Sequence, residues 1–202
     1  MVNIIKDVDL YDKFDGYDVI LIGTNLFGYM GNGIQLQVML NYPYVHNKNL
    51  ETRYGDRNKL GTILECASEN EPTFCLCYIV EGFNFRPDIQ KDYLSYEALE
   101  KTLRLVNIKY KGKKIACPLL GASRFDGNGD KERILEIFND TLTDVDCTVY
   151  DYHQLSREEM VLGMLKAESK VKEVDRKAYY EIVRKRKKEA EERFKKNGHR
   201  RY

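Results

Sequence analysis

The segment 18–23, Asp-Val-Ile-Leu-Ile-Gly, constrains the fold more than any other part of the sequence. Its apolar residues do not alternate with polar ones, which predicts a strand buried on both faces, as in a parallel sheet with helices on each side. Residues 24–33 are rich in Gly and Asn, and residues 34–42 then have helical spacing and stop before Pro43. The predicted order is therefore strand, glycine-rich loop, helix.

Strands and helices alternate along the following residues. A helix is predicted after Ser95, a candidate N-cap, because Leu99, Leu103 and Val106 follow at helical spacing. A second helix is predicted over 131–142. Further strands are predicted at residues 3–6, 62–66, 74–80, 114–117 and 147–150, and residues 43–61 are expected to form a loop or a short helix. This alternation predicts an α/β protein with a layered sheet.

The charge is divided unevenly along the chain. Ten Lys and Arg residues stand against three Glu between Arg184 and Arg201, a net charge of +7, although the whole chain carries only +1. The body is therefore mildly acidic, which does not suit a DNA-binding domain. The tail has two interpretations: a solvated or partner-binding helix, favoured by its interleaved Glu residues, or weak contact with nucleic acid. We expect a domain over 1–152 and a charged helical extension over 153–202.

The composition indicates a globular, cytoplasmic protein. Hydrophobic residues make up 43% of the chain and charged residues 32%, enough apolar material for a core. No apolar run approaches the ~18 residues of a membrane span, and the N-terminus lacks the pattern of a signal peptide, so no membrane contact is expected. The five cysteines are odd in number and lie mostly in apolar runs, which favours reduced, buried thiols. No metal site and no cofactor are expected.

Two glycine-containing loops each follow a predicted buried strand and precede a predicted helix. They span residues 24–33 and 121–129. Glycine lets a backbone approach a ligand closely, and the first peptide N–H groups of a helix favour an anion such as a diphosphate. Neither loop is a Walker A or Gly-x-Gly-x-x-Gly motif. The alternative is that both are ordinary surface turns.

These segments resemble the macrodomains. The ligand loop of that family is similar to Asn25 through Gly28-x-Met30-Gly31-x-Gly33 with the later Tyr42-Pro43, and four more pieces follow in the family's order. They are Leu60-Gly61-Thr62, the strand at 75–80, the helix beginning Ser95-Tyr96-Glu97-Ala98-Leu99, and Lys114-Ile115-Ala116-Cys117-Pro118-x-x-Gly121-Ala122. The most similar branch holds ADP-ribose-1″-phosphate phosphatases, terminal ADP-ribose glycohydrolases and phage-encoded relatives. The resemblance covers about residues 1–152.

The resemblance implies a three-layer α/β/α fold, with a mixed, mainly parallel sheet, that binds ADP-ribose or ADP-ribose-1″-phosphate. Asn25 would contact the distal ribose. Asp7, or else Asp9, would accept from the adenine amino group, and Tyr150 or Tyr152 would stack on the adenine. The remaining ligand-binding residues implied are Gly31, Asn32, Gly33 and Ile34 on one side of the diphosphate, and Gly121, Ala122, Ser123, Arg124 and Phe125 on the other side.

The chain also departs from the family's pattern. Ser123 stands where a Gly is usual, and Glu81-Gly82 stand where the glycohydrolase branch has a reactive Lys. Asp126 lies one residue from a catalytic Asp of that branch and is the candidate acid or base, unless it only bonds its own loop. Arg124 is either a clamp for a terminal phosphate or a solvated side chain.

Three functions follow as hypotheses. The first is an enzyme, with Asn25 and Asp126 as the candidate catalytic residues, that removes the 1″-phosphate from ADP-ribose-1″-phosphate or releases ADP-ribose from a modified group. The second is a non-catalytic ADP-ribose- or nucleotide-binding module. The third is an interaction protein whose working part is the charged tail.

Overall fold

The structure, a computed structural model, describes residues 1–82, 92–123 and 127–152, which belong to one compact unit, Met1–Tyr152. The charged helical extension predicted for 153–202 lies outside the described residues.

The centre of this unit is a six-stranded sheet with the strand order β1-β6-β5-β2-β4-β3. Only the pairing of β3 with β4 is antiparallel; the other neighbours run parallel. The strands are β1 (Asn3–Lys6), β2 (Val19–Asn25), β3 (Ile63–Cys66), β4 (Thr73–Val80), β5 (Lys114–Pro118) and β6 (Asp146–Asp151). The mixed, mainly parallel sheet is therefore confirmed.

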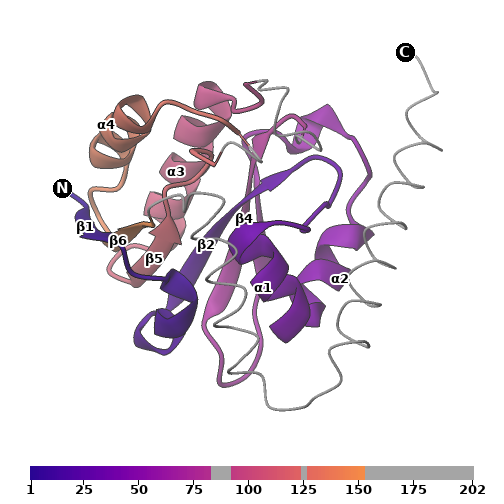
Figure 1. Cartoon of the computed structure of the whole chain (residues 1–202), viewed down its shortest axis with the longest axis horizontal. Coiled ribbons are helices and arrows are strands. Elements are labelled where there is room, and N and C mark those ends of the chain that lie inside the picture. The colour runs from indigo at the N-terminus through magenta and orange to yellow at the C-terminus, as the bar shows by residue number, and fades with distance from the viewer. Residues whose placement is uncertain (83–91, 124–126, 153–202) are drawn as a thin grey trace, which may run out of the picture. The chain divides into compact units, whose positions relative to one another are not determined.

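Helices cover both faces of this sheet, as Figure 1 shows. α3 (Tyr96–Lys109) and α4 (Lys131–Thr141) pack on one face, and α1 (Gly33–Asn41), α2 (Pro43–Glu51) and the 3₁₀ helix η1 (Leu10–Gly16) pack on the other. A second 3₁₀ helix, η2 (Arg57–Lys59), follows α2. The fold is thus the expected three-layer α/β/α arrangement.

Strand β2 is buried on both faces, as its sequence predicts. Leu21 packs among the α3 and α4 side chains, Ile20 and Ile22 pack among those of α1, α2 and η1, and all three are fully buried. The pairing of β2 with β4 shifts register between Thr24 and Asn25. Such an irregularity ends regular pairing and re-aims the chain, here at the start of the first glycine loop.

Local signals fix several helix ends. The Ser95 side chain accepts a hydrogen bond from the Ala98 N–H, which confirms it as the N-cap of α3. Helix α1 ends at Asn41, just before Pro43, as predicted. Pro43 is itself the first residue of α2, a position where its missing N–H costs no hydrogen bond. The stretch 43–61, expected as loop or short helix, therefore holds α2 and η2.

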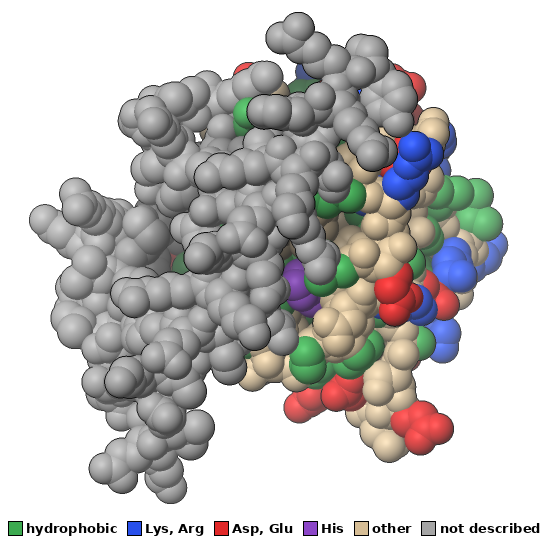
Figure 2. Space-filling model, turned by 90° about the vertical axis from the view of Figure 1, so that its right-hand side faces the viewer, with side chains coloured by type: hydrophobic (Ala, Val, Ile, Leu, Met, Phe, Trp, Pro, Cys, Tyr) green, Lys and Arg blue, Asp and Glu red, His purple; other side chains and the backbone are tan. Residues whose placement is uncertain are grey.

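All five cysteines are free and buried, as expected. In the ranges 1–82, 92–123 and 127–152, no helix is both long and apolar enough to cross a membrane. Figure 2 shows a face on which acidic and basic side chains of the described residues are interspersed with uncharged ones.

Candidate functional site

The two glycine loops leave the same edge of the sheet from neighbouring strands. β2 and β5 are parallel, with Val19 opposite Ile115, so both strands end at one edge. The chain just before each loop is also close to the other, since a Cβ built on Gly23 in β2 would lie 3.7 Å from the side chain of Leu120, which precedes the second loop. Ligands of open α/β sheets bind outside the carboxyl ends of strands. The candidate site therefore lies at this edge, between the loops that follow β2 and β5.

Asn25 holds the first loop from inside. Its side chain is 1% exposed, and its amide oxygen accepts from the N–H groups of Phe27 (3.0 Å) and Tyr29 (3.2 Å). Its amide nitrogen donates to the Tyr29 carbonyl oxygen (2.8 Å). The side chain thus fixes the path of the loop, and its contact with a distal ribose stays a prediction.

The first loop ends by opening helix α1 at Gly33. Gly33 has φ +49°, and a Cβ built on it would meet nothing within 4 Å, so the backbone is accessible there. Asn32, the N-cap, makes no side-chain capping bond to the first turn. Gly31 is needed for a different reason, because a Cβ there would collide with the hydroxyl of the buried Tyr29. Ile34 follows on the helix. The start of α1 therefore presents uncapped peptide N–H groups, the arrangement that favours an anion.

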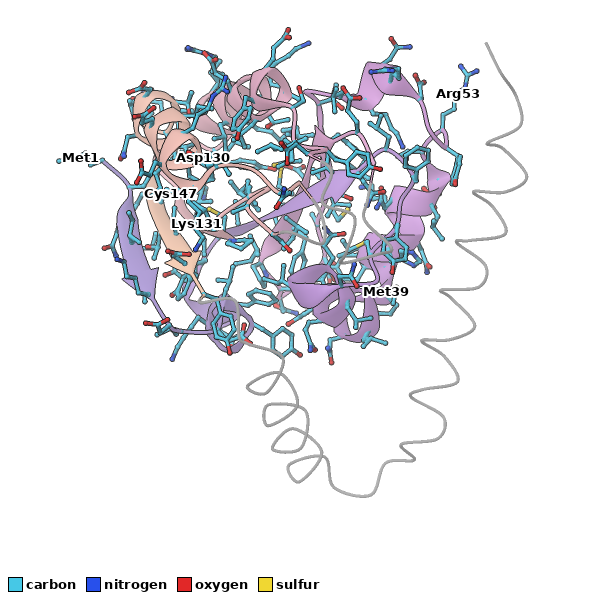
Figure 3. All side chains as sticks on the ribbon, turned by 45° about the horizontal axis from the view of Figure 1, so that its top comes forward. Met1, Met39, Arg53, Asp130, Lys131 and Cys147 are labelled. Atoms are coloured by element: carbon cyan, nitrogen blue, oxygen red, sulfur yellow. The ribbon has the colours of Figure 1, made fainter. Side chains whose placement is uncertain are left out.

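The second loop is folded back on itself. Gly121, with φ +78°, accepts a hydrogen bond through its carbonyl from the Gly129 N–H (2.9 Å), and the Ser123 carbonyl accepts from the Asn128 N–H (2.9 Å). A Cβ on Gly127 would collide with the Gly121 carbonyl oxygen, so this position needs glycine. The loop leads into α4, whose beginning, at Asp130 and Lys131, is labelled in Figure 3.

Two of the predicted second-loop ligands, Gly121 and Ser123, are thus fixed by loop bonds, and Ala122 lies between them. Arg124, Phe125 and Asp126 lie outside the described residues. Their predicted roles stay predictions.

The residues predicted to contact adenine lie further along the same edge. Asp7 follows β1 at φ +59°, is exposed, and donates its N–H to the Asp151 carbonyl (3.2 Å). Asp9, its alternative, is occupied as the cap of η1, where it accepts from the Tyr11 N–H (3.0 Å). Asp7 is therefore the better placed of the two.

Tyr150 does not suit the stacking role predicted for it. Its side chain is 4% exposed, its ring packs edge-on against Tyr17, and the two hydroxyls lie 2.8 Å apart. Burial and this hydrogen bond raise the pKa of Tyr150 to about 12. A ring enclosed in the core offers no face to a base, whereas Tyr152, the alternative, is 46% exposed.

Glu81 occupies the position at which resemblance to the glycohydrolase branch would predict a reactive lysine. Its carboxylate pairs with Arg57 at 3.0 Å, and both side chains are largely exposed. An exposed ion pair of this kind contributes little to stability. The position thus carries a carboxylate that is neutralised by a neighbour and no nucleophilic amine.

Sequence reasoning missed one charged residue beside the first loop. The Lys59 ammonium donates to the Leu26 carbonyl oxygen at 2.7 Å. Lys59 directly precedes the Leu60-Gly61-Thr62 piece of the family resemblance, but a lone lysine in a polar stretch carries no signal of burial.

No family model matches the sequence, and no curated protein matches it. Among solved structures, the chain is similar to the macrodomain of Mycobacterium tuberculosis DarG, with 18% identity and a TM-score of 0.53 over 74% of this chain and 97% of that one. It is similar to a Streptomyces coelicolor macrodomain protein, with 19% identity and a TM-score of 0.51 over 75% and 99%. It is also similar to Thermosipho africanus DarTG in complex with ADP-ribose, with 16% identity and a TM-score of 0.57 over 78% and 43%.

Proposed function

We propose that this chain, whose fold is that of the macrodomains, binds an ADP-ribose derivative at the carboxyl edge of its sheet. The observation that carries the proposal is the pairing of two glycine loops on adjacent parallel strands, the first of which opens an uncapped helix. A diphosphate between them would meet peptide N–H groups of residues 31–34 on one side and the second loop, residues 121–125, on the other, where the Ala122 N–H already donates to the Leu119 carbonyl oxygen (3.2 Å). The solved complex of Thermosipho DarTG with ADP-ribose supports this ligand class.

The strand order is compatible with a ligand that lies along this edge. β1 stands three strands from β2, a span of ~14 Å at the usual strand spacing, which suits an extended dinucleotide-sized ligand. The distal ribose would lie near Asn25, and the adenine would lie toward β6 and β1. There Asp7 would accept from the adenine amino group, and the exposed ring of Tyr152 would supply the stacking surface.

The reaction we favour is hydrolysis of ADP-ribose-1″-phosphate to ADP-ribose and inorganic phosphate. Water forms a bond to phosphorus, the bond between phosphorus and the C1″ oxygen breaks, and the proton lost by the water ends on that leaving oxygen, with Asp126 as the candidate group that transfers it. A site with few ionisable groups suits this chemistry, because binding in the right orientation and electrostatic stabilisation supply most of the rate.

A non-catalytic binding module is the second candidate. Two observations favour it: Glu81 is paired with Arg57, and the Asn25 amide is already bonded to its own loop. Release of ADP-ribose from a modified group is the third candidate and would use the same site.

Calorimetry with ADP-ribose, with ATP and NAD as controls, tests the ligand class. We expect ADP-ribose to bind at least roughly tenfold more tightly than either control, a difference of about 1.4 kcal/mol. Equal or absent binding would contradict the proposal. Phosphate release from ADP-ribose-1″-phosphate then separates the phosphatase from the binding module, and loss of ADP-ribose from a modified protein identifies the hydrolase.

Asp126→Ala tests the acid–base assignment. Loss of a general acid or base lowers turnover by roughly 10²-fold and leaves the affinity for ADP-ribose nearly unchanged. The rate of phosphate release and the calorimetric Kd are the two measurements. An unchanged rate would show that Asp126 is not the acid or base, and would favour the alternative that it only bonds its own loop.

A further inference from the structure

The segment between α2 and β3 packs against the outer side of the first glycine loop. The Leu26 carbonyl oxygen accepts two hydrogen bonds from this segment, one from the Gly55 N–H (2.9 Å) and one from the Lys59 ammonium (2.7 Å). The rings of Phe27 and Tyr54 meet edge to face, with centroids 5.2 Å apart. The first loop is thus fixed by hydrogen bonds to the Asn25 side chain and, separately, by its contacts with the segment between α2 and β3.

Lys59 is half-buried among neutral partners. Its ammonium also donates to the Thr52 hydroxyl (3.1 Å) and lies 4.9 Å from the centre of the Tyr78 ring. The Tyr78 hydroxyl in turn donates to Asn49 (2.7 Å), which is 1% exposed. None of the ion pairs found among the described residues includes Lys59. Beside the first loop, the Lys59 charge is therefore partly buried, and no carboxylate of residues 1–82, 92–123 or 127–152 forms an ion pair with it.

We infer that Lys59 is a positioning residue for the first glycine loop and that its charge strengthens the binding of an anionic ligand there. The inference rests on the proposed function. A partly buried cation without an anionic partner interacts favourably with a diphosphate bound nearby, because water screens the pair less than it would at the surface. The hydrogen bond to Leu26 keeps the loop in place before the ligand arrives, so binding needs less ordering of the chain.

Titration of Lys59 gives the inference a distinctive signature. Burial lowers the pKa of Lys59 to about 8, and among the described residues the charged group that acts on it is Asp56, on its own segment. Its other neighbours are the uncharged Leu26 and Thr52, and Tyr78, which stays neutral because burial raises its pKa. An anionic ligand favours the charged lysine, so binding takes up a proton near pH 8 and weakens as the pH rises above it. The diphosphate of ADP-ribose keeps its charge throughout this range.

The first measurement uses the full chain without ligand. Amide hydrogen exchange at Phe27 and Tyr29 is compared in wild type, Lys59→Met and Lys59→Arg, with Lys111→Met as the control, since Lys111 is an exposed partner of Asp144. We expect roughly tenfold faster exchange in Lys59→Met, because the outer anchor of the loop is lost. The control should match wild type. Unchanged exchange in Lys59→Met would overturn the positioning role, whether or not any ligand binds.

The second measurement is the affinity for ADP-ribose between pH 6.5 and 9.5. We expect the wild-type and Lys111→Met affinities to fall by roughly threefold across pH 8, because deprotonation of Lys59 removes one partly screened attraction between its charge and the anionic ligand. The affinity of Lys59→Met should be weaker and independent of pH. Lys59→Arg keeps its charge at every pH used, so its binding should stay tight and independent of pH.

The two measurements separate the inference from the proposed function. If wild type does not bind ADP-ribose but Lys59→Met exchanges faster, the proposed function fails and the positioning role stands. If ADP-ribose binds equally well to wild type and Lys59→Met with the same pH profile, the contribution of the charge is refuted and the proposed function stands.

Discussion

At the scale of single residues, two glycines form a matched pair for testing the site. Gly33 and Gly112 both have positive φ, +49° and +76°, and a Cβ built on either would meet nothing within 4 Å. Alanine therefore brings similar backbone strain at both, about 1–2 kcal/mol. Gly112 lies in the turn before β5, at the opposite edge of the sheet from the candidate site.

We expect Gly33→Ala and Gly112→Ala to lower the free energy of unfolding by similar amounts. Only Gly33→Ala should lose affinity for ADP-ribose, by roughly tenfold or more, because its new methyl group occupies the space through which a phosphate approaches the backbone. Urea unfolding and calorimetry measure the two effects. Equal affinities in the two variants would argue against a diphosphate at the start of α1.

Asn25 is a second test at this scale. Asn25→Ala removes three hydrogen bonds and leaves two N–H groups of the first loop without their acceptor. We expect a loss of about 2–4 kcal/mol in the free energy of unfolding. Asn41, whose exposed side-chain amide donates to the Gln37 carbonyl oxygen within α1, is the control, and Asn41→Ala should change stability by less than about 0.5 kcal/mol. A stable Asn25→Ala protein would show that the side chain does not hold the loop.

At the scale of elements, the sequence predicts best where the signals are local. β2, the glycine loop and α1 follow from an unbroken apolar run, a cluster of glycines and a proline. α2 is harder to predict because Val45 and Asn49 are its buried residues, so its face lacks a strong apolar period. The antiparallel pairing of β3 and the helix η1 depend on contacts with distant segments, which no local pattern reveals.

At the candidate site, too, the sequence predicts the features that depend on local signals and misses those that depend on packing. The sequence places the two glycine loops correctly after buried strands, but it does not reveal that these strands, β2 and β5, are neighbours in the sheet. It does not reveal that the Asn25 amide turns inward to its own loop, that Tyr150 is enclosed beside Tyr17, or that Lys59 reaches Leu26. Each of these depends on which side chain fills the space next to it, and that is settled only when the layers pack.

The edge strand β3 offers a prediction about pH. The Tyr110 hydroxyl at the end of α3 donates to the Glu65 carboxylate (2.6 Å), and this hydrogen bond, helped by Lys109, lowers the pKa of Glu65. A lowered carboxyl pKa stabilises the folded state above the unfolded-state pKa, and the stabilisation is lost as the pH falls through the folded-state pKa.

Tyr110→Phe should therefore destabilise the protein by about 1 kcal/mol at pH 7, and by less as the pH falls toward 3, because protonation of Glu65 in the folded state removes the charged hydrogen bond. Urea unfolding of wild type and variant at the two pH values measures the difference. The same loss at both pH values would show that packing of the ring, and not the charged hydrogen bond, is what Tyr110 contributes.

At the scale of the whole molecule, all of the candidate site residues belong to Met1–Tyr152. We expect a chain shortened by deletion of residues 156–202 to keep its affinity for ADP-ribose within roughly twofold. Thermal unfolding would check that it folds, and calorimetry would measure its affinity. A large loss of affinity in a folded, shortened protein would favour the interpretation in which the tail is the working part.

The interior position of all five thiols has a practical consequence. Maleimide reagents attack accessible thiolates, so the native protein should label slowly. A cysteine introduced on the surface would then be the fast-reacting one, and a single fluorophore could be attached there without first removing the natural cysteines. Placed near the end of β6, such a dye would report ligand arrival at the edge of the sheet through a change in its emission.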